Sequence, residues 1–310
     1  MPKASYKSRG QLSVGAVTLE PSVFGNTWYV DPVNGGAGNT GRDPRSAFAL
    51  IATAIAAAAA WDTIVLSPGT HTIASATAAL SPRAGQRFIA AIPPGMARPN
   101  VIVTGNGGAN LVDLEVSGTQ WEGILFQADA NGVTNLINIA DTATVTGVKF
   151  KNCWFDGNGK TTVDGLNAVD ATFILTGMSV EGCRFTDLDI GIDIGVLGWA
   201  GSCVERCIFE MRDTAGTDIG INLGDTAASA TGYGWIVRDN EFLGPTDAGA
   251  DAVGIVIAGT ENTTGLGGMS RNYFAFCNVA SVTIDKLSKG EVNNFVGDAA
   301  TGGTLVDPGT

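Results

Sequence analysis

The sequence predicts an all-β solenoid of stacked strands, and three observations support this prediction. The 310-residue chain contains 43 glycines and only 15% charged residues, a composition that favours short strands and turns over a helical bundle. Apolar residues make up 45% of the chain, which is enough to fill a substantial core. Two kinds of strand-like segment recur along the sequence. Such recurrence is typical of a solenoid.

The first repeated segment places a Cys or an Asn two positions before a Phe. Its copies are FKNCWF (150–155), VEGCRF (180–185), VERCIF (204–209), VRDNEF (237–242), MSRNYF (269–274) and EVNNF (291–295). GILF (123–126) fits the pattern with Ile124 in the place of the Cys or Asn. The period is irregular, roughly 20 to 35 residues, as expected when loops vary in length while strands stay in register. Stacking of these copies predicts one internal column of Phe155, Phe185, Phe209, Phe242 and Phe274.

The second repeated segment alternates Ile with Gly, Asp or Asn, a period of two that is typical of a strand with one buried face. Its copies are DIGIDIG (189–195), DIGINLG (218–224), AVGIVIAG (252–259) and SVTID (281–285). Because no helical segment separates the two kinds of strand, successive copies must stack in parallel, about 4.8 Å apart. The predicted fold is therefore a parallel β-helix.

Residues 27–62 predict a different structure ahead of the coils. NTWYVDP (26–32) predicts a strand, NGGAGNTGRDP (34–44) a loop, and SAFALIATAIAAAAAWD (46–62) a capping α-helix. We expect Ser46 to be the N-cap of this helix and Phe48, Ile51 and Ile55 to share one face. The chain then divides into an extended N-terminal arm (1–26), this capping unit (27–62), the β-helix (63–300) and a C-terminal tail (301–310).

The segment 28–73 resembles the start of right-handed parallel β-helix proteins of the pectate-lyase-like superfamily. The resemblance rests on a strand ending in Val-Asp, a Gly/Asn loop, an alanine-rich helix and DTIVLSPGTHTI (62–73), with His71 where the family usually has Tyr. It implies a right-handed parallel β-helix over 27 to about 300. The superfamily includes lyases, hydrolases, phage tailspikes and non-catalytic virion proteins, so the resemblance is more specific for fold than for activity.

Charge and cysteine usage exclude several classes of function. The net charge of −12 disfavours nucleic acid as a partner, because an acidic surface repels phosphates. No apolar run approaches the roughly 18 residues of a membrane span, and the N-terminus has no apolar core of a secretory signal. Five cysteines, an odd number, indicate reduced thiols and synthesis in a cytoplasm.

The cysteines and the histidine are interpreted as structural. The bend position before each Phe holds Cys153, Cys183, Cys207, Asn240, Asn272 or Asn293. A small residue stacked at a bend explains this whole set, so we interpret the thiols as buried and unpaired. A zinc site lacks ligands in a chain with one histidine. His71 has no partner base or nucleophile indicated by spacing, which favours a packing or surface role.

The outward side of the second repeated segment carries the candidate site. With the Ile residues inside, Asp189 and Asp193 are expected to point outward, with Asp218 and Asn222 directly above them in the next coil. The outward glycines, Gly191, Gly220 and Gly254, would leave a shallow groove. Stacked carboxylates about 4.8 Å apart raise one pKa or attract a cation such as Ca²⁺. That separation is close to the roughly 5 to 5.5 Å of retaining glycosidases.

Two interpretations of this face stay open. Stacked Asp and Asn rows solvate the outside of many solenoids. If the protein is an enzyme, Asp189, Asp193 and Asp218 are the predicted catalytic residues, and with Asn222 they are the groove or cation candidates. The resemblance implies a basic residue near acids for lyase chemistry, and no Arg or Lys falls in these strands. No cofactor is expected, apart from Ca²⁺ at these carboxylates.

The leading hypothesis from sequence is a structural virion protein of a phage-like particle, either a capsid decoration, a head-spike or a tail-associated β-helix. It would be a homotrimer, made in the host cytoplasm and located in the virion. Its basic arm would hold it to capsid or tail proteins through Lys3, Tyr6, Lys7 and Arg9. One alternative is a polysaccharide lyase or glycoside hydrolase of the tailspike type. The other is a non-catalytic β-helix that binds a cell-surface glycan.

Overall fold

The computed structural model describes most of the chain. Side chains and backbone are described for 25–73, 79–91, 98–105, 110–129, 133–139, 143–160, 162–168, 175–194, 200–211, 218–223, 234–245, 252–255, 268–275 and 277. For 5–7, 11–14, 17–18, 199, 256–257, 294–297 and 304–306 it describes the backbone alone.

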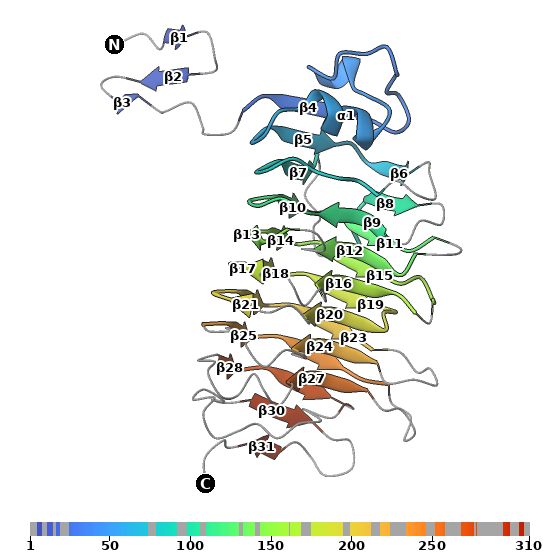
Figure 1. Cartoon of the computed structure of the whole chain (residues 1–310), viewed down its shortest axis with the longest axis vertical. Helices are drawn as coiled ribbons and strands as arrows, with labels where there is room; N and C mark the ends of the chain where they lie inside the picture. The colour runs from blue at the N-terminus through green and yellow to red at the C-terminus, as the bar shows by residue number, and fades with distance from the viewer. Residues whose placement is uncertain are drawn as a thin grey trace.

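Three long sheets run side by side along the molecule, and each coil of the chain contributes a strand to them (Figure 1). Sheet 1 contains β4 (Thr27–Val30), β5 (Thr63–Leu66), β7 (Arg87–Ala90), β10 (Gln120–Glu122), β14 (Lys149–Lys151), β18 (Ser179–Glu181), β22 (Cys203–Glu205), β25 (Ile236–Arg238) and β28 (Gly268–Ser270). Sheet 2 contains β6 (Gly69–Ile73), β8 (Val101–Gly105), β11 (Leu125–Gln127), β15 (Trp154–Asp156), β19 (Arg184–Thr186), β23 (Ile208–Glu210), β26 (Glu241–Leu243), β29 (Tyr273–Ala275), β30 (Asn294–Gly297) and β31 (Thr304–Val306). Sheet 3 contains β9 (Asn110–Leu114), β12 (Asn135–Ile139), β16 (Asp164–Ala168), β20 (Ile190–Ile194), β24 (Ile219–Leu223) and β27 (Val253–Ile257).

Neighbouring strands in these sheets are parallel, except for β31, which pairs antiparallel with β30. A short extra ladder joins β13 (Val145–Thr146), β17 (Leu175–Thr176) and β21 (Trp199–Ala200). The interior is one continuous apolar core. This arrangement is the predicted parallel β-helix.

The predicted phenylalanine column is confirmed. Phe155 pairs with Phe185, and the register continues through Phe209 and Phe242 to Phe274. The rings stack with centroids 4.6 to 4.8 Å apart, so each contributes its aromatic contact as well as its buried area. The last copy differs from the prediction, since Val296 rather than the adjacent Phe295 pairs with Phe274.

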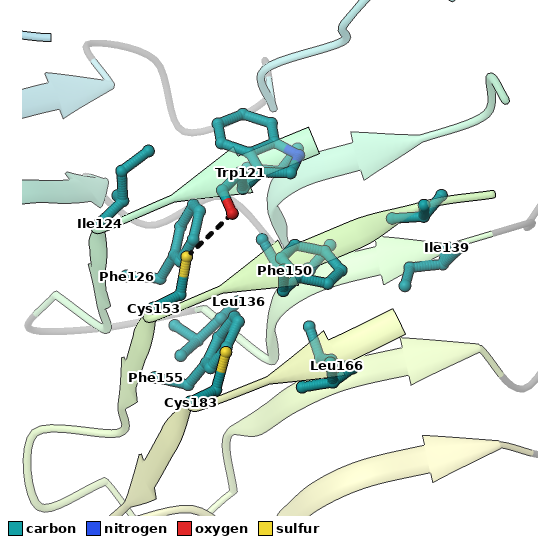
Figure 2. Packing of buried hydrophobic residues seen from close by; sticks show 14 of the residues in the cluster. Trp121, Ile124, Phe126, Leu136, Ile139, Phe150, Cys153, Phe155, Leu166 and Cys183 are labelled. Carbon is teal, nitrogen blue, oxygen red and sulfur yellow. Dashed lines mark hydrogen bonds between the residues drawn. The ribbon is translucent and has the colours of Figure 1, made fainter. Parts of the chain in front are cut away.

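The bend before each Phe explains the Cys or Asn. The residue that precedes it has a positive φ, for example Gly182 at 61° and Asn152 at 51°, which turns the chain from sheet 1 into sheet 2. The next side chain then points inward, and Cys153 donates from Sγ to the Trp121 carbonyl at 3.5 Å (Figure 2). The thiols at this position are buried, and all five cysteines are free. The prediction of buried, unpaired thiols is confirmed.

The glycines of sheet 3 do not point outward, so that prediction was wrong. A Cβ on Gly220 would lie 2.6 Å from the Gly254 carbonyl oxygen and 2.7 Å from a ring carbon of Phe242. The register pairs Ile190 with Ile219 and Ile192 with Ile221, and both the second and the third residue of each strand face the core. The alternation therefore breaks once per strand, and the glycines leave room for the phenylalanine column instead of a groove.

Asp62 anchors the first strand to the coils. Its buried carboxylate accepts hydrogen bonds from Trp28 Nε1 at 2.7 Å, from the Asn26 N–H at 2.6 Å and from the Ala59 N–H at 2.8 Å. These bonds hold β4 against β5, its parallel neighbour. A charged group that is only 1% exposed is stable there because several donors satisfy it.

The helix is shorter than predicted. α1 (Ile51–Ala57) lies at the N-terminal end of the stack, beside β4, with Ile51 and Ile55 buried (Figure 1). Ser46 is not its cap, because Ser46 ends a separate 3-10 turn, η1 (Pro44–Ser46), that Asp43 caps. Phe48 is extended and forms a bridge to Val30. The Asp43 carboxylate accepts hydrogen bonds from the N–H groups of Arg45 and Ser46, so the turn is capped by Asp43 and stays separate from α1.

The arm and the tail both contain strands. β1 (Ser5–Lys7), β2 (Gln11–Val14) and β3 (Val17–Thr18) form an antiparallel sheet within the arm that was predicted to be extended. β31 lies in the predicted tail. The segment 281–285 and Asn293 lie outside the described residues. Within the described parts, no helix has the length and apolarity needed to cross a membrane.

Candidate functional site

Two columns of polar side chains run along the outer side of sheet 3. The first residues of its early strands are Asn110, Asn135 and Asp164. The fourth residues of the strands from β9 to β24 are Asp113, Asn138, Asn167, Asp193 and Asn222. Amides connect neighbouring coils, as where Asn135 Nδ2 donates to Asn110 Oδ1 at 2.8 Å. Three carboxyls gather where the amides of these columns give way to acids, and they form the acidic cluster of Asp164, Asp189 and Asp193.

Asp164 is the carboxyl with the most altered chemistry in this cluster. Burial raises its pKa to about 6, and the charges of Asp193 and Asp189 act in the same direction. Two hydrogen bonds oppose this shift, from Asn167 Nδ2 at 3.1 Å and from the Ile190 N–H at 3.2 Å. A carboxyl with this pKa holds a proton for much of the time near pH 6.

Asp193 lies one coil further along the fourth-residue column. Burial raises its pKa and the charge of Asp189 raises it further, while a hydrogen bond from Asn222 lowers it. That bond runs from Asn222 Nδ2 to Asp193 Oδ1 at 2.8 Å. The predicted stacking of Asn222 over Asp193 is confirmed by their register. At 9% exposure Asp193 is an outer-side residue that its neighbours largely cover.

Asp189 and Asp218 occupy the same place in consecutive coils, but they are not equivalent. The Ile219 N–H donates to the Asp189 carbonyl at 2.9 Å, which places Asp218 in the coil next to Asp189. Asp189 is half-buried, whereas Asp218 is only 2% exposed. Asp218 is therefore covered by its surroundings and is not an exposed acid of the predicted groove. The accessible acids are therefore Asp164 and Asp189, with Asp193 beneath them.

This cluster can move a proton and is not arranged as a metal site. Within the described parts of the chain, no group of three or more His, Cys, Asp and Glu side chains is placed to hold a metal ion. A carboxyl with a pKa of about 6 beside a second carboxyl is the combination used for general acid catalysis near neutral pH. Asp164 was not among the residues predicted from the sequence.

A second charged surface, also not predicted, lies on the outer side of sheet 1. A cleft of about 70 Å³ is lined by residues that include Arg87, Glu122, Lys149, Lys151 and Glu181. Glu122, Lys151 and Glu181 are register neighbours, so opposite charges alternate from coil to coil. The alternation K-F-K around Phe150 was a signal for it in the sequence. The cleft is far below the roughly 300 Å³ of small ligand pockets, so we do not interpret it as a ligand site.

The predicted assembly residues belong to the arm. Tyr6 and Lys7 lie in β1, where Tyr6 pairs with Leu12. Lys3 and Arg9 lie outside the described residues. The role of this arm stays a prediction.

Comparison with known proteins supports the fold independently. The chain is similar to the solved structure of Escherichia coli ybhc, with a TM-score of 0.54 at 11% identity, over 94% of this chain and 90% of that one. It is also similar to the pectin methylesterase of Aspergillus niger, with a TM-score of 0.51 at 11% identity, over 89% and 86% of the two chains. The chain has a right-handed parallel β-helix fold.

This β-helix is also similar to a rhamnogalacturonan lyase, with a TM-score of 0.50 at 14% identity, over 91% of this chain and 90% of that one. No protein-family model matches its sequence, and no curated protein is significantly similar to it. At such low sequence identity the similarity shows a shared fold and not a shared activity. Function must therefore be argued from this β-helix's own side chains.

Proposed function

We propose that this β-helix hydrolyses a glycan along the outer side of sheet 3. The observation that carries the proposal is the raised pKa of Asp164, about 6, in a cluster with two further carboxyls. Hydrolases of glycosidic bonds use a protonated carboxyl as acid and an ionised one as base or nucleophile. Hydrolysis is favoured over lyase chemistry because β16, β20 and β24 contain no Lys or Arg.

In the proposed reaction the Asp164 carboxyl gives its proton to the oxygen of the scissile glycosidic bond as that bond breaks. The oxygen of a water molecule forms a bond with the anomeric carbon, and the proton of that water passes to Asp189. Asp193, held by Asn222, keeps the pKa of Asp164 high through its negative charge. The net reaction consumes one water for each bond cleaved.

The charge of the site also defines the substrate class. Three carboxyls in one cluster, on a protein of net charge −12, repel a polyuronate. We therefore expect a neutral or amino-sugar polymer as substrate. Some of the structurally similar proteins are named for pectin or rhamnogalacturonan. Pectic polymers are therefore the acidic substrates against which this expectation should be tested.

The test measures new reducing ends from neutral, amino-sugar and pectic polymers between pH 4 and 8. We expect cleavage of a non-acidic polymer that declines above about pH 6, because Asp164 then loses its proton. Asp164→Asn should lower kcat by about 10²- to 10⁴-fold. Asp113→Asn, on the outer side of the same sheet but in the other column and on β9, is the matched control and should leave kcat unchanged. Absence of cleavage across the panel, with or without glycan binding, would refute the hydrolase proposal.

The second candidate is a structural component of a phage-like particle. The feature that favours it is the separate antiparallel sheet β1–β3 that precedes the coils, an element suited to pairing with a neighbouring protein. In this proposal the protein forms a homotrimer on capsid or tail proteins, and its location is the virion. Deleting residues 1–24 should then abolish particle association while the circular dichroism of the coils is unchanged. Equal association of both forms would exclude the arm as the anchor.

A further inference from the structure

A cavity of about 410 Å³ lies at the N-terminal end of the molecule, away from the acidic cluster. It is open to solvent on one side and is lined by α1, β6 and the segment 79–83. Ala52, Ile55 and Ala56 lie on one face of α1, three and four residues apart, and all three line it. Leu50, which is 48% exposed, and Ile73 complete its apolar wall. Its volume falls within the range of small-molecule sites, roughly 300 to 1,000 Å³.

One cationic side chain, that of Arg83, lies at this cavity; one hydrogen bond orients its guanidinium and another anchors its backbone. Arg83 Nη2 donates to the Ala56 carbonyl at 3.1 Å, and the Arg83 N–H donates to Gln86 Oε1 at 2.9 Å. Gln86 is itself fully buried and donates from Nε2 to the Ala59 carbonyl at 3.3 Å. Among the described residues, no carboxylate pairs with Arg83. The exposed guanidinium keeps unused donors, which can bind an anion.

His71 also lies in the cavity wall, where a hydrogen bond to the backbone holds its ring. The residue is 4% exposed, and its Nε2 lies 2.9 Å from the Ser67 carbonyl oxygen. Because a carbonyl oxygen only accepts, Nε2 carries the ring proton and Nδ1 is a bare acceptor. Nδ1 is buried without a hydrogen-bond partner in the described structure. A carboxylate only accepts and cannot bond to this buried acceptor, so His71 contributes its ring to the wall and not a polar contact to a ligand.

We propose that this cavity binds a small apolar carboxylic acid, whose carboxylate pairs with Arg83 while its hydrocarbon body fills the space between α1 and β6. The apolar lining selects the hydrocarbon body, and the Arg83 guanidinium selects the charged end. This site is separate from the acidic cluster on sheet 3. Its occupancy therefore does not depend on the proposed hydrolase activity.

The chain contains a single histidine, so the imidazole resonances of His71 are an unambiguous reporter of this cavity by NMR. The full-length protein is titrated with 2-naphthoate and with octanoate, and in parallel with 2-naphthylmethanol and 1-octanol. We expect saturable shifts of the His71 signals with the acids, at concentrations at least about tenfold lower than with the alcohols, since a charge-assisted pair is lost in the alcohols.

Three variants distinguish specific binding in this cavity from non-specific binding to the protein surface. Arg83→Gln can keep the bond to the Ala56 carbonyl but loses the charge, and it should weaken acid binding about tenfold or more. Arg83→Lys keeps the charge and should recover part of that loss, whereas Ala52→Phe fills the cavity and should remove the shifts. Arg45→Gln, an exposed arginine outside the cavity, is the matched control. Circular dichroism verifies that each variant is folded. The proposal is overturned if neither acid shifts His71, if acids and alcohols bind alike, or if Arg83→Gln binds the acids as the wild type does.

Discussion

Asp164 shows how one buried carboxyl links stability to pH. In the folded protein its pKa is about 6, against an ordinary value of 3.8, so the native state holds a proton that the unfolded chain releases between these values. Stability therefore falls as pH rises through this window, by about 1–3 kcal/mol in all. Asp164 is a local cost to the fold near neutral pH, as is common at functional sites.

Asp164→Asn should remove that cost. An amide at this position continues the column of Asn110 and Asn135, whose side chains already bond from coil to coil. We expect the free energy of unfolding at pH 7 to rise by about 1–3 kcal/mol. Below pH 4 both proteins are uncharged at this position and the difference should vanish. Urea unfolding at pH 3.5 and pH 7 measures this, and a difference that is equal at the two pH values would contradict the electrostatic explanation.

Two substitutions at equivalent bends should lower the free energy of unfolding by different amounts. Asn240 Oδ1 accepts from the Cys207 N–H at 2.9 Å, and its Nδ2 donates to the Val204 carbonyl at 3.1 Å. Asn240→Ala leaves both buried groups without a side-chain partner and should lower the free energy of unfolding by about 2–4 kcal/mol. Cys183→Ala, at the same bend in another coil, removes one weak bond to the Glu181 carbonyl and should cost about 1 kcal/mol. Equal losses in chemical denaturation would show that the bend needs only a small side chain.

At the scale of elements, the inward side chains of sheet 3 and the rings of the phenylalanine column fill the same part of the core. The second residue of each strand faces inward; it is Leu111 in β9 and Leu136 in β12, but Gly191 in β20 and Gly220 in β24. The glycines lie against Phe209 and Phe242. The ring fills the volume that a leucine fills in the earlier coils, so the core keeps its density while the sequence changes.

Gly220→Ala should therefore be strongly destabilising, although its backbone conformation suits any residue. The new methyl would overlap the Gly254 carbonyl and the Phe242 ring, and backbone atoms cannot move aside without disturbing two coils. We expect a loss of about 2–4 kcal/mol in the free energy of unfolding. Gly38→Ala is the matched control, because a Cβ there meets no atom within 4 Å. A tolerated Gly220→Ala in thermal unfolding would mean that the coils are loosely packed.

The same element explains what sequence reasoning could and could not predict. The Cys/Asn-x-Phe spacing predicted the register of sheet 2 from Phe155 to Phe274 correctly, because the rings stack on one another in only one alignment of the strands. Strict alternation failed in sheet 3, because two consecutive residues of each strand face inward. That failure hid the true direction of Gly191 and the burial of Asp218. Asp164 was missed because DGLNA carries no isoleucine, so only the register with Asn135 identifies it.

At the scale of the whole molecule, each coil rests mainly on its two neighbours. Contacts between consecutive strands of one sheet, such as β16 with β20 and β20 with β24, dominate the structure. Stability is then close to a sum over coils and their interfaces. Such a chain can lose one complete coil without losing the others, provided that the cut joins equivalent positions.

Val180 and Val204 are register partners in sheet 1, so deleting residues 180–203 joins equivalent positions and removes one complete coil. We expect this variant to fold, with the circular dichroism of the parent and a rod shorter by about 4.8 Å in small-angle X-ray scattering. It lacks Asp189 and Asp193, so a folded variant should also have lost the proposed hydrolase activity. Deleting residues 180–191 removes strands from sheets 1 and 2 but leaves Ile192 and most of β20, and it should not fold because the remaining strands meet the wrong partners. If both deletions fold equally well, coil register does not determine this structure.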